Sequence, residues 1–369
     1  MRNKTLFISN SMKNKILFLA SLLFFGATVS AMTGLSPKAT NMSLTETNFK
    51  GQLKVLSLNT WHEGTTVKGG FDAIVDVILQ SEADIVLLSE VKNYDDVIFT
   101  QHILEVLKTK GTTFYSSSLK TDAVILSKFP IESTSAINSS SITKCMIKLN
   151  KKTSIAVYSA HLDYTHYACY LPRGYDGIDW KKLPEPIVDT QKILKQNIDS
   201  QRDEEIALFV KDALKEQQKG NLVLLGGDFN EPSHLDWTAA TKDLYDHNGT
   251  IVPWHNSLTL QENGFLDSYR VKYPDPVKYP GFTWPAYNTD VELSKLLWAK
   301  DADERDRIDF IYFYPNKKLT LTDAVIVGPT GSIVKGKGVE THDQDTFLKP
   351  NGIWPTDHKG VLATFSIAD

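Results

Sequence analysis

The sequence NLVLLGGDFNEP, residues Asn221–Pro232, decides which fold this chain predicts. Its first half is a continuous apolar run, which is typical of a strand buried on both faces. Gly226 and Gly227 remove side chains where the strand ends, so that a backbone or a ligand can come close. Asp228 and Asn230 follow two residues apart and point the same way if the chain is still extended. The stretch indicates either a preorganised carboxylate–amide pair or a polar turn that only satisfies backbone groups.

Apolar patterns on both sides of this stretch predict the other elements of a mixed fold. A helix is expected where Phe71, Ile74, Val75, Ile78 and Leu79 recur at helical spacing. A second helix is expected over residues 189–218, and Ser233–Asp236 resembles a capping box that opens a third. Strands are expected at 52–59, 84–90, 122–127, 307–313, 319–327 and 361–367, with a hairpin of 141–149 and 154–161.

The first 31 residues carry the pattern of an export signal. Residues 2–15 hold four basic side chains and no acid, and residues 16–25 form an apolar core too short for a comfortable membrane span. Small residues then precede a cut near Ala31. We expect a cleaved signal peptide over 1–31, a flexible leader over 32–50 and one catalytic domain over 51–369, secreted or periplasmic, with no transmembrane span in the mature chain. An uncleaved membrane anchor is the alternative.

The charge of the mature chain argues against a polyanionic partner. Removing the signal leaves 36 basic residues against 44 acidic ones, a net charge near −8. Sequence-independent nucleic-acid binding rests on clustered Lys and Arg, so nucleic acid is possible but not favoured. Only Cys145 and Cys169 are present, which allows one disulfide bridge in an oxidising compartment but no disulfide framework. Neither cysteine has the spacing of a zinc site.

Eight polar side chains share one topological position, at or next to the end of a predicted strand. They are Asn59, Glu90, His161, Asp228, Asn230, Asp309, Asp357 and His358. Buried carboxylates are costly unless they are paired or bind a cation. Four acids, two amides and two histidines at one sheet edge suit an oxygen-ligated cation such as Mg²⁺ and leave His and Asp free for acid–base work. Unrelated helix caps and turns would explain one polar residue at a strand end. They would not explain eight such residues.

Six short segments carry a family resemblance. LSLN (56–59), SE (89–90), AHL (160–162), GDFN (227–230), RIDF (307–310) and TDH (356–358) resemble, in this order, the endonuclease/exonuclease/phosphatase superfamily. Its members include secreted DNases, abasic-site endonucleases, inositol polyphosphate phosphatases and bacterial sphingomyelinases. The resemblance spans Leu53 to Ile367 and points to a secreted, bacterial-type member. It implies an α+β protein with the DNase I-like fold, a four-layer α/β/β/α sandwich of two packed mixed β-sheets.

The resemblance also implies a metal site. Glu90 resembles the principal ligand, with Asn59 and Asp357 near the same cation. The expected cofactor is Mg²⁺, for which Mn²⁺ can substitute. A phosphoester is anionic, so a cation that neutralises its non-bridging oxygens helps a nucleophile to approach.

Five further positions carry acid–base and phosphate-binding roles in the family. Asp228 resembles the group that orients or deprotonates the attacking water, and Asn230 resembles a donor to the phosphate. His358, steadied by Asp309, and His161 resemble the pair that flanks the scissile phosphate. A carboxylate behind a histidine fixes its tautomer and lets it move a proton near neutral pH.

The substrate is less well determined than the chemistry. Loops at 165–186, 269–306 and 328–355 match none of the named groups, and Trp61, Arg173, Trp237 and Arg305 are candidates for the substrate rim. The Trp, Tyr and Pro content of these loops favours a shaped pocket that binds one or two phosphates. We expect the enzyme to be a monomer. A secreted DNA or RNA endonuclease is the alternative within the fold. A non-catalytic binding module is the alternative from another class, and the eight intact positions favour the enzyme.

Overall fold

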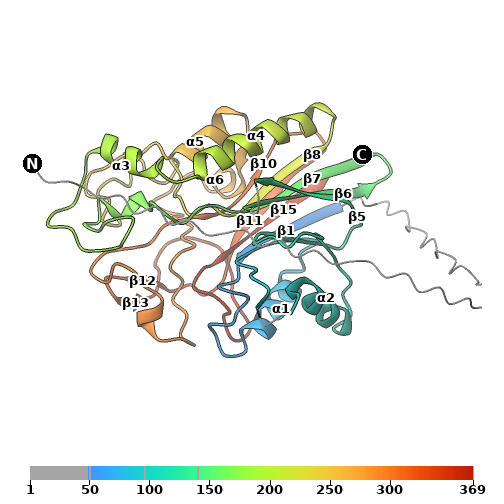
Figure 1. The fold of residues 1–369 in the computed structure, drawn as a ribbon, viewed down its shortest axis with the longest axis horizontal. Helices are drawn as coiled ribbons and strands as arrows, with labels where there is room; N and C mark the ends of the chain where they lie inside the picture. Colours follow the sequence, from blue (N-terminus) through green and yellow to red (C-terminus); the bar gives the residue numbers. More distant parts are fainter. Residues whose placement is uncertain (1–48, 50, 95–96, 139–140, 369) are drawn as a thin grey trace, which may run out of the picture. The chain divides into compact units, whose positions relative to one another are not determined.

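Two mixed β-sheets pack face to face, and the longer helices cover their outer sides (Figure 1). The structure is a computed structural model that describes residues 49, 51–94, 97–138 and 141–368. The expected signal peptide at 1–31 lies outside these residues, as does the expected leader at 32–50 apart from Phe49. The arrangement confirms the predicted four-layer α/β/β/α sandwich.

The first sheet has seven strands in the order β14-β11-β15-β1-β2-β4-β3. Its strands are β1 (Gly51–Asn59), β2 (Ile85–Ser89), β3 (Tyr115–Ser116), β4 (Val124–Ser127), β11 (Leu319–Val327), β14 (Phe347–Leu348) and β15 (Gly360–Ile367). Strand β1 lies at its centre, parallel to β2 and antiparallel to β15. Helices α1 (Gly70–Ser81) and α2 (Phe99–Thr109) pack on its outer face through one apolar cluster.

The second sheet has six strands in the order β5-β6-β7-β8-β10-β9. Its strands are β5 (Ile131–Asn138), β6 (Ile142–Asn150), β7 (Thr153–His161), β8 (Leu222–Asp228), β9 (Leu266–Asp267) and β10 (Asp309–Phe313). Helices α4 (Arg202–Gln218) and α5 (His255–Glu262) cover its outer face. The remaining elements are short: α3 (Thr190–Asn197), α6 (Ser268–Lys272), β12 (Ser332–Val334), β13 (Lys337–Val339) and the 3₁₀ turns η2 (Ala168–Tyr170) and η3 (Leu293–Lys295).

The main core lies between the two sheets. Alternate side chains of a strand point to opposite faces, so Val55 and Leu87 of the first sheet meet Val157 and Leu224 of the second. The intervening side chains, such as Leu56, pack outward against α1 and α2. Burial on both faces explains why these strands are continuous apolar runs in the sequence.

Most of the predicted elements are present, and two predictions need correction. Helix α1 and the β6–β7 hairpin match their predicted positions, whereas the helix expected over 189–218 is interrupted at 198–201. The helix predicted to open at Ser233 is wrong, because residues 233–247 form turns. The Ser233 hydroxyl accepts from Leu235 N, a turn contact, and Asp236 is taken up by the guanidinium groups of Arg270 and Arg307.

The two cysteines are free thiols in different parts of the fold, so the possible bridge is not formed. Cys145 lies in the core between the sheets, where burial raises the pKa of its thiol to about 11. Cys169 lies in a separate apolar cluster beneath the loops. Both are therefore packing residues.

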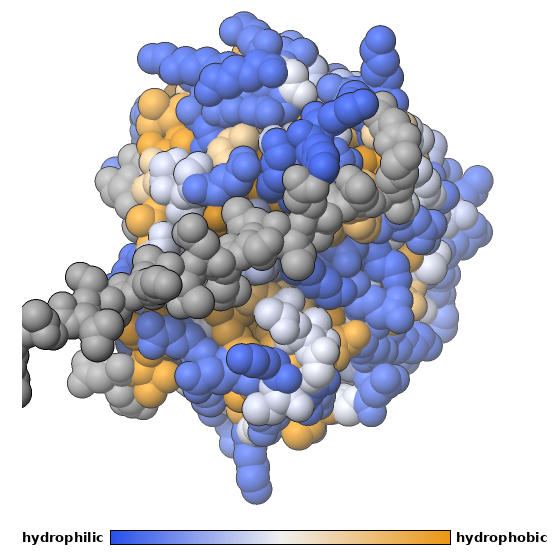
Figure 2. Space-filling model, turned by 90° about the vertical axis from the view of Figure 1, so that its right-hand side faces the viewer, coloured by the Kyte–Doolittle hydropathy of each residue, from blue (hydrophilic) through white to orange (hydrophobic). Residues whose placement is uncertain are grey.

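No helix in the described ranges is long and apolar enough to cross a membrane. Figure 2 shows the end of the molecule at which β15 and the chain finish, and outside the grey atoms hydrophilic residues prevail there. The polar cluster described next lies at the opposite end of the strands.

Candidate active site

The second sheet brings three of the predicted residues to one level. In the parallel pair β7–β8, His161 is level with Asp228, and in the antiparallel pair β8–β10, Asp228 is level with Asp309. Gly227 allows this close pairing, because a Cβ atom there would overlap the backbone of Ala160. The glycine pair singled out in the sequence is therefore used for backbone approach between strands.

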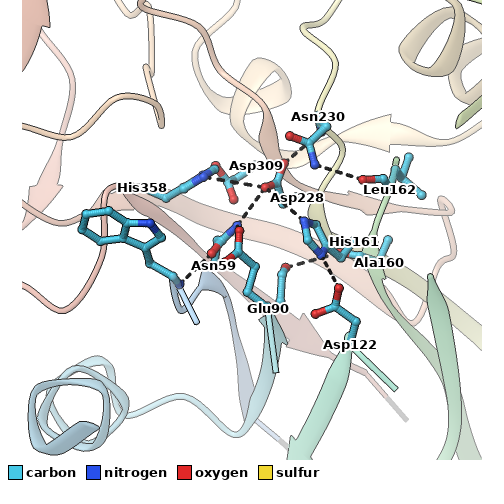
Figure 3. Close-up of polar contacts among 12 residues, drawn as sticks. Asn59, Glu90, Asp122, Ala160, His161, Leu162, Asp228, Asn230, Asp309 and His358 are labelled. Carbon is cyan, nitrogen blue, oxygen red and sulfur yellow. Dashed lines mark hydrogen bonds and ion pairs between the residues drawn. The ribbon is translucent and has the colours of Figure 1, made fainter. Parts of the chain in front are cut away.

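The first sheet contributes its residues at the same end. In the parallel pair β1–β2, Asn59 is level with Ser89, and Glu90 follows directly. Strand β15 runs the other way and begins at Gly360, so that Asp357 and His358 immediately precede it. The ends of β1, β2, β7 and β8 and the beginnings of β10 and β15 thus meet in one cluster (Figure 3).

Asn59 links the two sheets at the centre of this cluster. Its Nδ2 donates to Glu90 Oε1 at 3.2 Å and to Asp228 Oδ2 at 2.9 Å, while its Oδ1 accepts from Trp61 N at 2.8 Å. Rotating the amide would lose all three hydrogen bonds, so the network fixes its orientation. Asn59 therefore holds two carboxylates in place, and its oxygen faces away from them. This geometry argues against the direct metal ligation predicted for Asn59.

Glu90 and Asp357 supply the donor set that fits a divalent cation. Both line the cleft, and both present carboxylate oxygens. Burial raises the pKa of Asp357 to about 6, and the negative charge of Glu90 adds to this rise, although the charge of His358 opposes it. Two acids that repel each other in a buried site are the arrangement a hard, oxygen-ligated cation relieves. Glu90 and Asp357 are thus residues that could hold a divalent cation.

A left-handed turn after β1 shapes the mouth of this site. Trp61, His62 and Glu63 have φ angles of 44°, 60° and 62°, which L-residues seldom adopt in succession. Side chains fix each amide: His62 N donates to Glu90 Oε2 at 3.0 Å, and Glu63 N donates to Thr60 Oγ1 at 3.2 Å. The turn therefore both steadies Glu90 and places Trp61 on the wall of the cleft, as predicted for a rim residue.

Asp309 and His358 form one of two Asp–His pairs. His358 Nδ1 donates to Asp309 Oδ2 at 2.9 Å, and His358 Nε2 lies 3.7 Å from Asp228 Oδ2. Burial lowers the pKa of His358, but the charges of Asp309 and Asp228 outweigh it and raise that pKa well above its usual value. The geometry agrees with the predicted steadying of His358 by Asp309.

The second pair contains a residue that the sequence analysis missed. His161 Nδ1 donates to Asp122 Oδ2 at 2.7 Å, and His161 Nε2 lies 3.9 Å from Asp228 Oδ2. Burial lowers the pKa of His161, but the hydrogen bond to Asp122 and the charge of Asp228 raise it overall. Asp122 precedes β4, which is antiparallel to β2, so its start lies at the same edge as Glu90. The sequence signal that could have identified Asp122 was an acid just before a strand that runs antiparallel to its neighbour.

Asp228 lies between the two pairs and has a fixed geometry. Its Oδ2 accepts from Asn59, and its Oδ1 accepts from Asn230 N at 2.8 Å. Asn230 itself has a left-handed backbone, with φ 48°, and its Nδ2 donates to Leu162 O at 2.9 Å. Both residues line the cleft, and their roles toward water and phosphate stay predictions.

Asp228, Asp309 and His358 form a second arrangement that could bind a metal. One ligand atom from each lies within 4.8 Å of the others. The His358 ring is hydrogen-bonded to Asp309, and the surrounding charges raise its pKa, so this group is also suited to proton transfer. The cluster therefore offers two candidate donor sets for a cation, this group and the Glu90–Asp357 pair.

Six residues of the cluster line a cleft of about 380 Å³, large enough for more than a phosphate group: Glu90, His161, Asp228, Asn230, Asp357 and His358. Its second wall is aromatic and comes mainly from the loops at 165–186 and 269–306. Besides the residues named above, the cleft is lined by His62, Lys92, Tyr164, Tyr167, Tyr170, Trp180, Trp284, Trp298 and Ile308. Lys92 is the only Lys or Arg among the described lining residues, and it is paired with Asp122 at 2.7 Å.

Three of the four predicted rim residues lie elsewhere. The Arg173 side chain is fully buried and paired with Asp306, and the indole of Trp237 donates to the same carboxylate at 3.0 Å. Arg305 forms a fork with Asp303 and packs over Tyr245. These side chains hold the loops together from beneath, so their predicted role in substrate contact is corrected to a structural one.

Two packed mixed sheets with this polar cluster at one end define a DNase I-like fold. The sequence model of the Endonuclease/Exonuclease/phosphatase family matches residues 56–358. The chain therefore belongs to this family, whose members are generally metal-dependent phosphoesterases or nucleases. Family membership and the cluster together support hydrolase activity with a divalent metal.

Individual relatives are distant. The uncharacterized protein F14F9.5 of Caenorhabditis elegans is 27% identical over 319 residues, covering 85% of this chain and 91% of the relative. Truncated TDP2 from C. elegans is 16% identical, with TM-score 0.48, over 85% of this chain and 97% of that structure. The human nocturnin catalytic domain is 13% identical, with TM-score 0.45, over 86% and 95%. The expectation of a bacterial-type member gains no support from this nematode relative.

Proposed function

We propose that this protein is a Mg²⁺-dependent phosphoesterase that hydrolyses a small or lipid-linked phosphodiester or phosphomonoester by in-line attack of water. One observation carries this proposal: Asp228 lies between two Asp–His pairs, next to the Glu90–Asp357 carboxylates. A binding module has no need for this many buried, mutually repelling acids. An enzyme that moves protons beside a cation does.

The roles follow from the geometry. Glu90 and Asp357 would hold a cation, which would neutralise charge on the phosphate oxygens when bound. Asp228, with both carboxylate oxygens fixed by hydrogen bonds, orients a water molecule and accepts its proton. His161 and His358 place an Nε2 atom on either side of Asp228, where one can stabilise the phosphate and the other can protonate the leaving oxygen.

The charge of the cleft favours a substrate with one or two phosphates. A long nucleic acid would need several cationic contacts, and Lys92 is the single Lys or Arg among the described residues that line the cleft. The acidic balance of the mature chain supports the same view. A secreted endonuclease on this fold is the competing function, and it predicts a strong dependence on salt.

A panel of phosphoesters tests this function. Purified mature protein is incubated with bis-p-nitrophenyl phosphate, nucleotides, sugar phosphates, sphingomyelin, phosphoinositides, RNA and plasmid DNA at low and moderate salt. We expect turnover of a small or lipid-linked ester that changes little with salt. Plasmid nicking that collapses by about a thousandfold as salt rises would establish the endonuclease in its place. If no ester is hydrolysed, the remaining alternative is a non-catalytic binding module.

Export and monomeric state are part of the proposal. The support for export is the charged start, short apolar stretch and small-residue exit of residues 1–31. Expression of the full chain in a bacterial host should give periplasmic protein beginning just after Ala31, as determined by N-terminal sequencing. Retention of residues 1–31 in the membrane fraction would identify an anchor. Light scattering of the mature protein should give the monomer mass.

A further inference from the structure

The aromatic wall of the cleft contains two groups of ring contacts, one beside the acidic cluster and one at Trp180 and Trp298. The indole of Trp284 lies within hydrogen-bond reach of Asp357. The rings of Trp284 and Tyr167 have centroids 6.5 Å apart, and those of Tyr167 and Tyr170 are 5.1 Å apart. The wall ends at Trp180 and Trp298, whose ring centroids are 4.7 Å apart. A group attached to a phosphate at the acidic cluster would therefore extend along aromatic side chains.

The Trp180–Trp298 pair is held in place at an energetic cost. Trp180 has a left-handed backbone, with φ 55°, which is rare for a bulky residue and usually marks a functional constraint. A tight turn fixes it: Trp180 N donates to Asp176 O, and the Asp176 carboxylate accepts from the amides of Ile178 and Asp179. The loop thus directs this indole toward Trp298.

The second tryptophan is fixed from below by a buried acid. Glu304 Oε1 accepts from Trp298 N at 2.9 Å, from Ala299 N at 2.7 Å and from Tyr170 Oη at 2.7 Å. The two loops are also joined by an ion pair between Lys182 and Asp301 at 2.7 Å. Trp298 is nevertheless 54% exposed. A large apolar side chain whose backbone is anchored and which is open to solvent beside a cleft is available for a ligand.

We propose that Trp180 and Trp298 form a stacking platform for a planar ring carried by the ester group of the substrate, and that the substrate is a small nucleoside phosphoester. This inference rests on the proposed function. The two indoles touch at an interplanar angle of 39°, and the solvent-exposed indole of Trp298 offers a flat apolar face, which suits stacking of a planar ring. A quaternary ammonium group would instead need rings arranged around it as a cage. The single cleft lysine limits the substrate to few phosphates.

Paired probes that differ only in the base test this platform. For binding we would use adenosine 5′-sulfate and ribose 5-sulfate, which resist hydrolysis by a phosphoesterase, and measure affinity by calorimetry. For turnover we would use adenosine 5′-(methyl phosphate) and ribose 5-(methyl phosphate), and measure kcat/KM. The variants are Trp298→Ala and Trp298→Phe. Tyr115→Ala, an exposed aromatic on β3 outside the cleft, is the matched control.

The probe with a base should bind the wild-type protein between about fivefold and a hundredfold more tightly than the base-free probe. Trp298→Ala should remove this preference in binding and in kcat/KM, whereas Trp298→Phe and Tyr115→Ala should keep most of it. Equal affinity of the two probes for the wild-type protein, or a preference that survives in Trp298→Ala, would overturn the platform.

The design separates the platform from the catalytic proposal. A base preference in binding, with neither methyl phosphate nor any ester of the panel hydrolysed, would refute the proposed function and leave the platform standing. Hydrolysis of both esters at equal rates would refute the platform and leave the function. Glycerophosphocholine hydrolysed in preference to the nucleoside ester, with the same dependence on Trp298, would overturn the planar ring in favour of a quaternary ammonium group.

Discussion

The strand-end cluster and the loop wall face each other across one cleft, yet different kinds of contact fix them. Asn59, Asp228 and Asp309 are placed by strand register, so their positions follow from the pairing of the sheets. The wall has little regular structure and is fixed by buried ion pairs such as Arg173–Asp306. The difference predicts that variants of the cluster lose turnover and keep the fold. Variants of the supporting loops should lose stability and keep turnover.

The largest effect is expected at the metal side of the cluster. Glu90→Gln should lower kcat/KM on the order of a thousandfold for every substrate, because it weakens the hold on a cation worth several kcal/mol in the transition state. Circular dichroism should be unchanged, since Glu90 lies at a cleft and not in a core. Glu105→Gln, an exposed acid on α2, is the control. Wild-type turnover by Glu90→Gln would show that Glu90 does not bind the metal.

The next effect concerns the two histidines. His161→Ala and His358→Ala should each cost about a hundredfold or more in kcat, the usual contribution of a positioned acid or base. The double variant should lose less than the product of the two, because both histidines serve the same step around Asp228. His255→Ala, on the outside of α5, should behave as wild type. Near-normal turnover by either single variant would show that its assigned role is wrong.

A smaller effect with a defined direction is expected at Asp122. Its hydrogen bond and charge help to raise the pKa of His161, so Asp122→Asn should lower that pKa. The limb of the pH–rate profile that reports His161 should then move to lower pH, whether the histidine acts as acid or base. A limb that stays in place, or that moves to higher pH, would show that it does not report the titration of His161.

The loop wall should respond in the opposite way. Arg173→Ala leaves the buried carboxylate of Asp306 without its partner and should lower the free energy of unfolding by about 3–5 kcal/mol. Turnover of the folded variant should stay within about twofold, since Arg173 does not line the cleft. Urea denaturation and kcat are the two measurements, with the exposed Lys181→Ala as control. A tenfold loss of kcat without loss of stability would restore Arg173 as a substrate contact.

The same contrast explains what could be read from the sequence. Buried strands are recognisable as apolar runs, and polar residues at their ends stand out, which is why Glu90, His161 and Asp228 were found. Asp122 escaped because it lies in none of the six segments that carry the family resemblance, unlike Asp309 and Asp357, which also stand at or before the beginning of a strand. Only the antiparallel pairing of β4 with β2 shows that the beginning of β4 lies at the active edge.

The loops could not be interpreted in this way, because their sequence has no period. Arg173 and Trp237 resemble recognition residues, but a shared carboxylate, Asp306, draws both into the interior. Trp180 and Trp298 are far apart in sequence, and only the folded loops bring them together. Long-range polar partners therefore decide which loop residues face the cleft, and such partners leave no local signal in the chain.

Metal dependence is the most direct test of the central claim. Mature protein is stripped with EDTA, and hydrolysis of the ester that the panel identifies is followed before and after Mg²⁺ or Mn²⁺ is added back. The geometry of Glu90 and Asp357 predicts that activity disappears on chelation and returns with the metal, and that Glu90→Gln needs far more Mg²⁺ for the same rate. Full activity in EDTA would contradict the account.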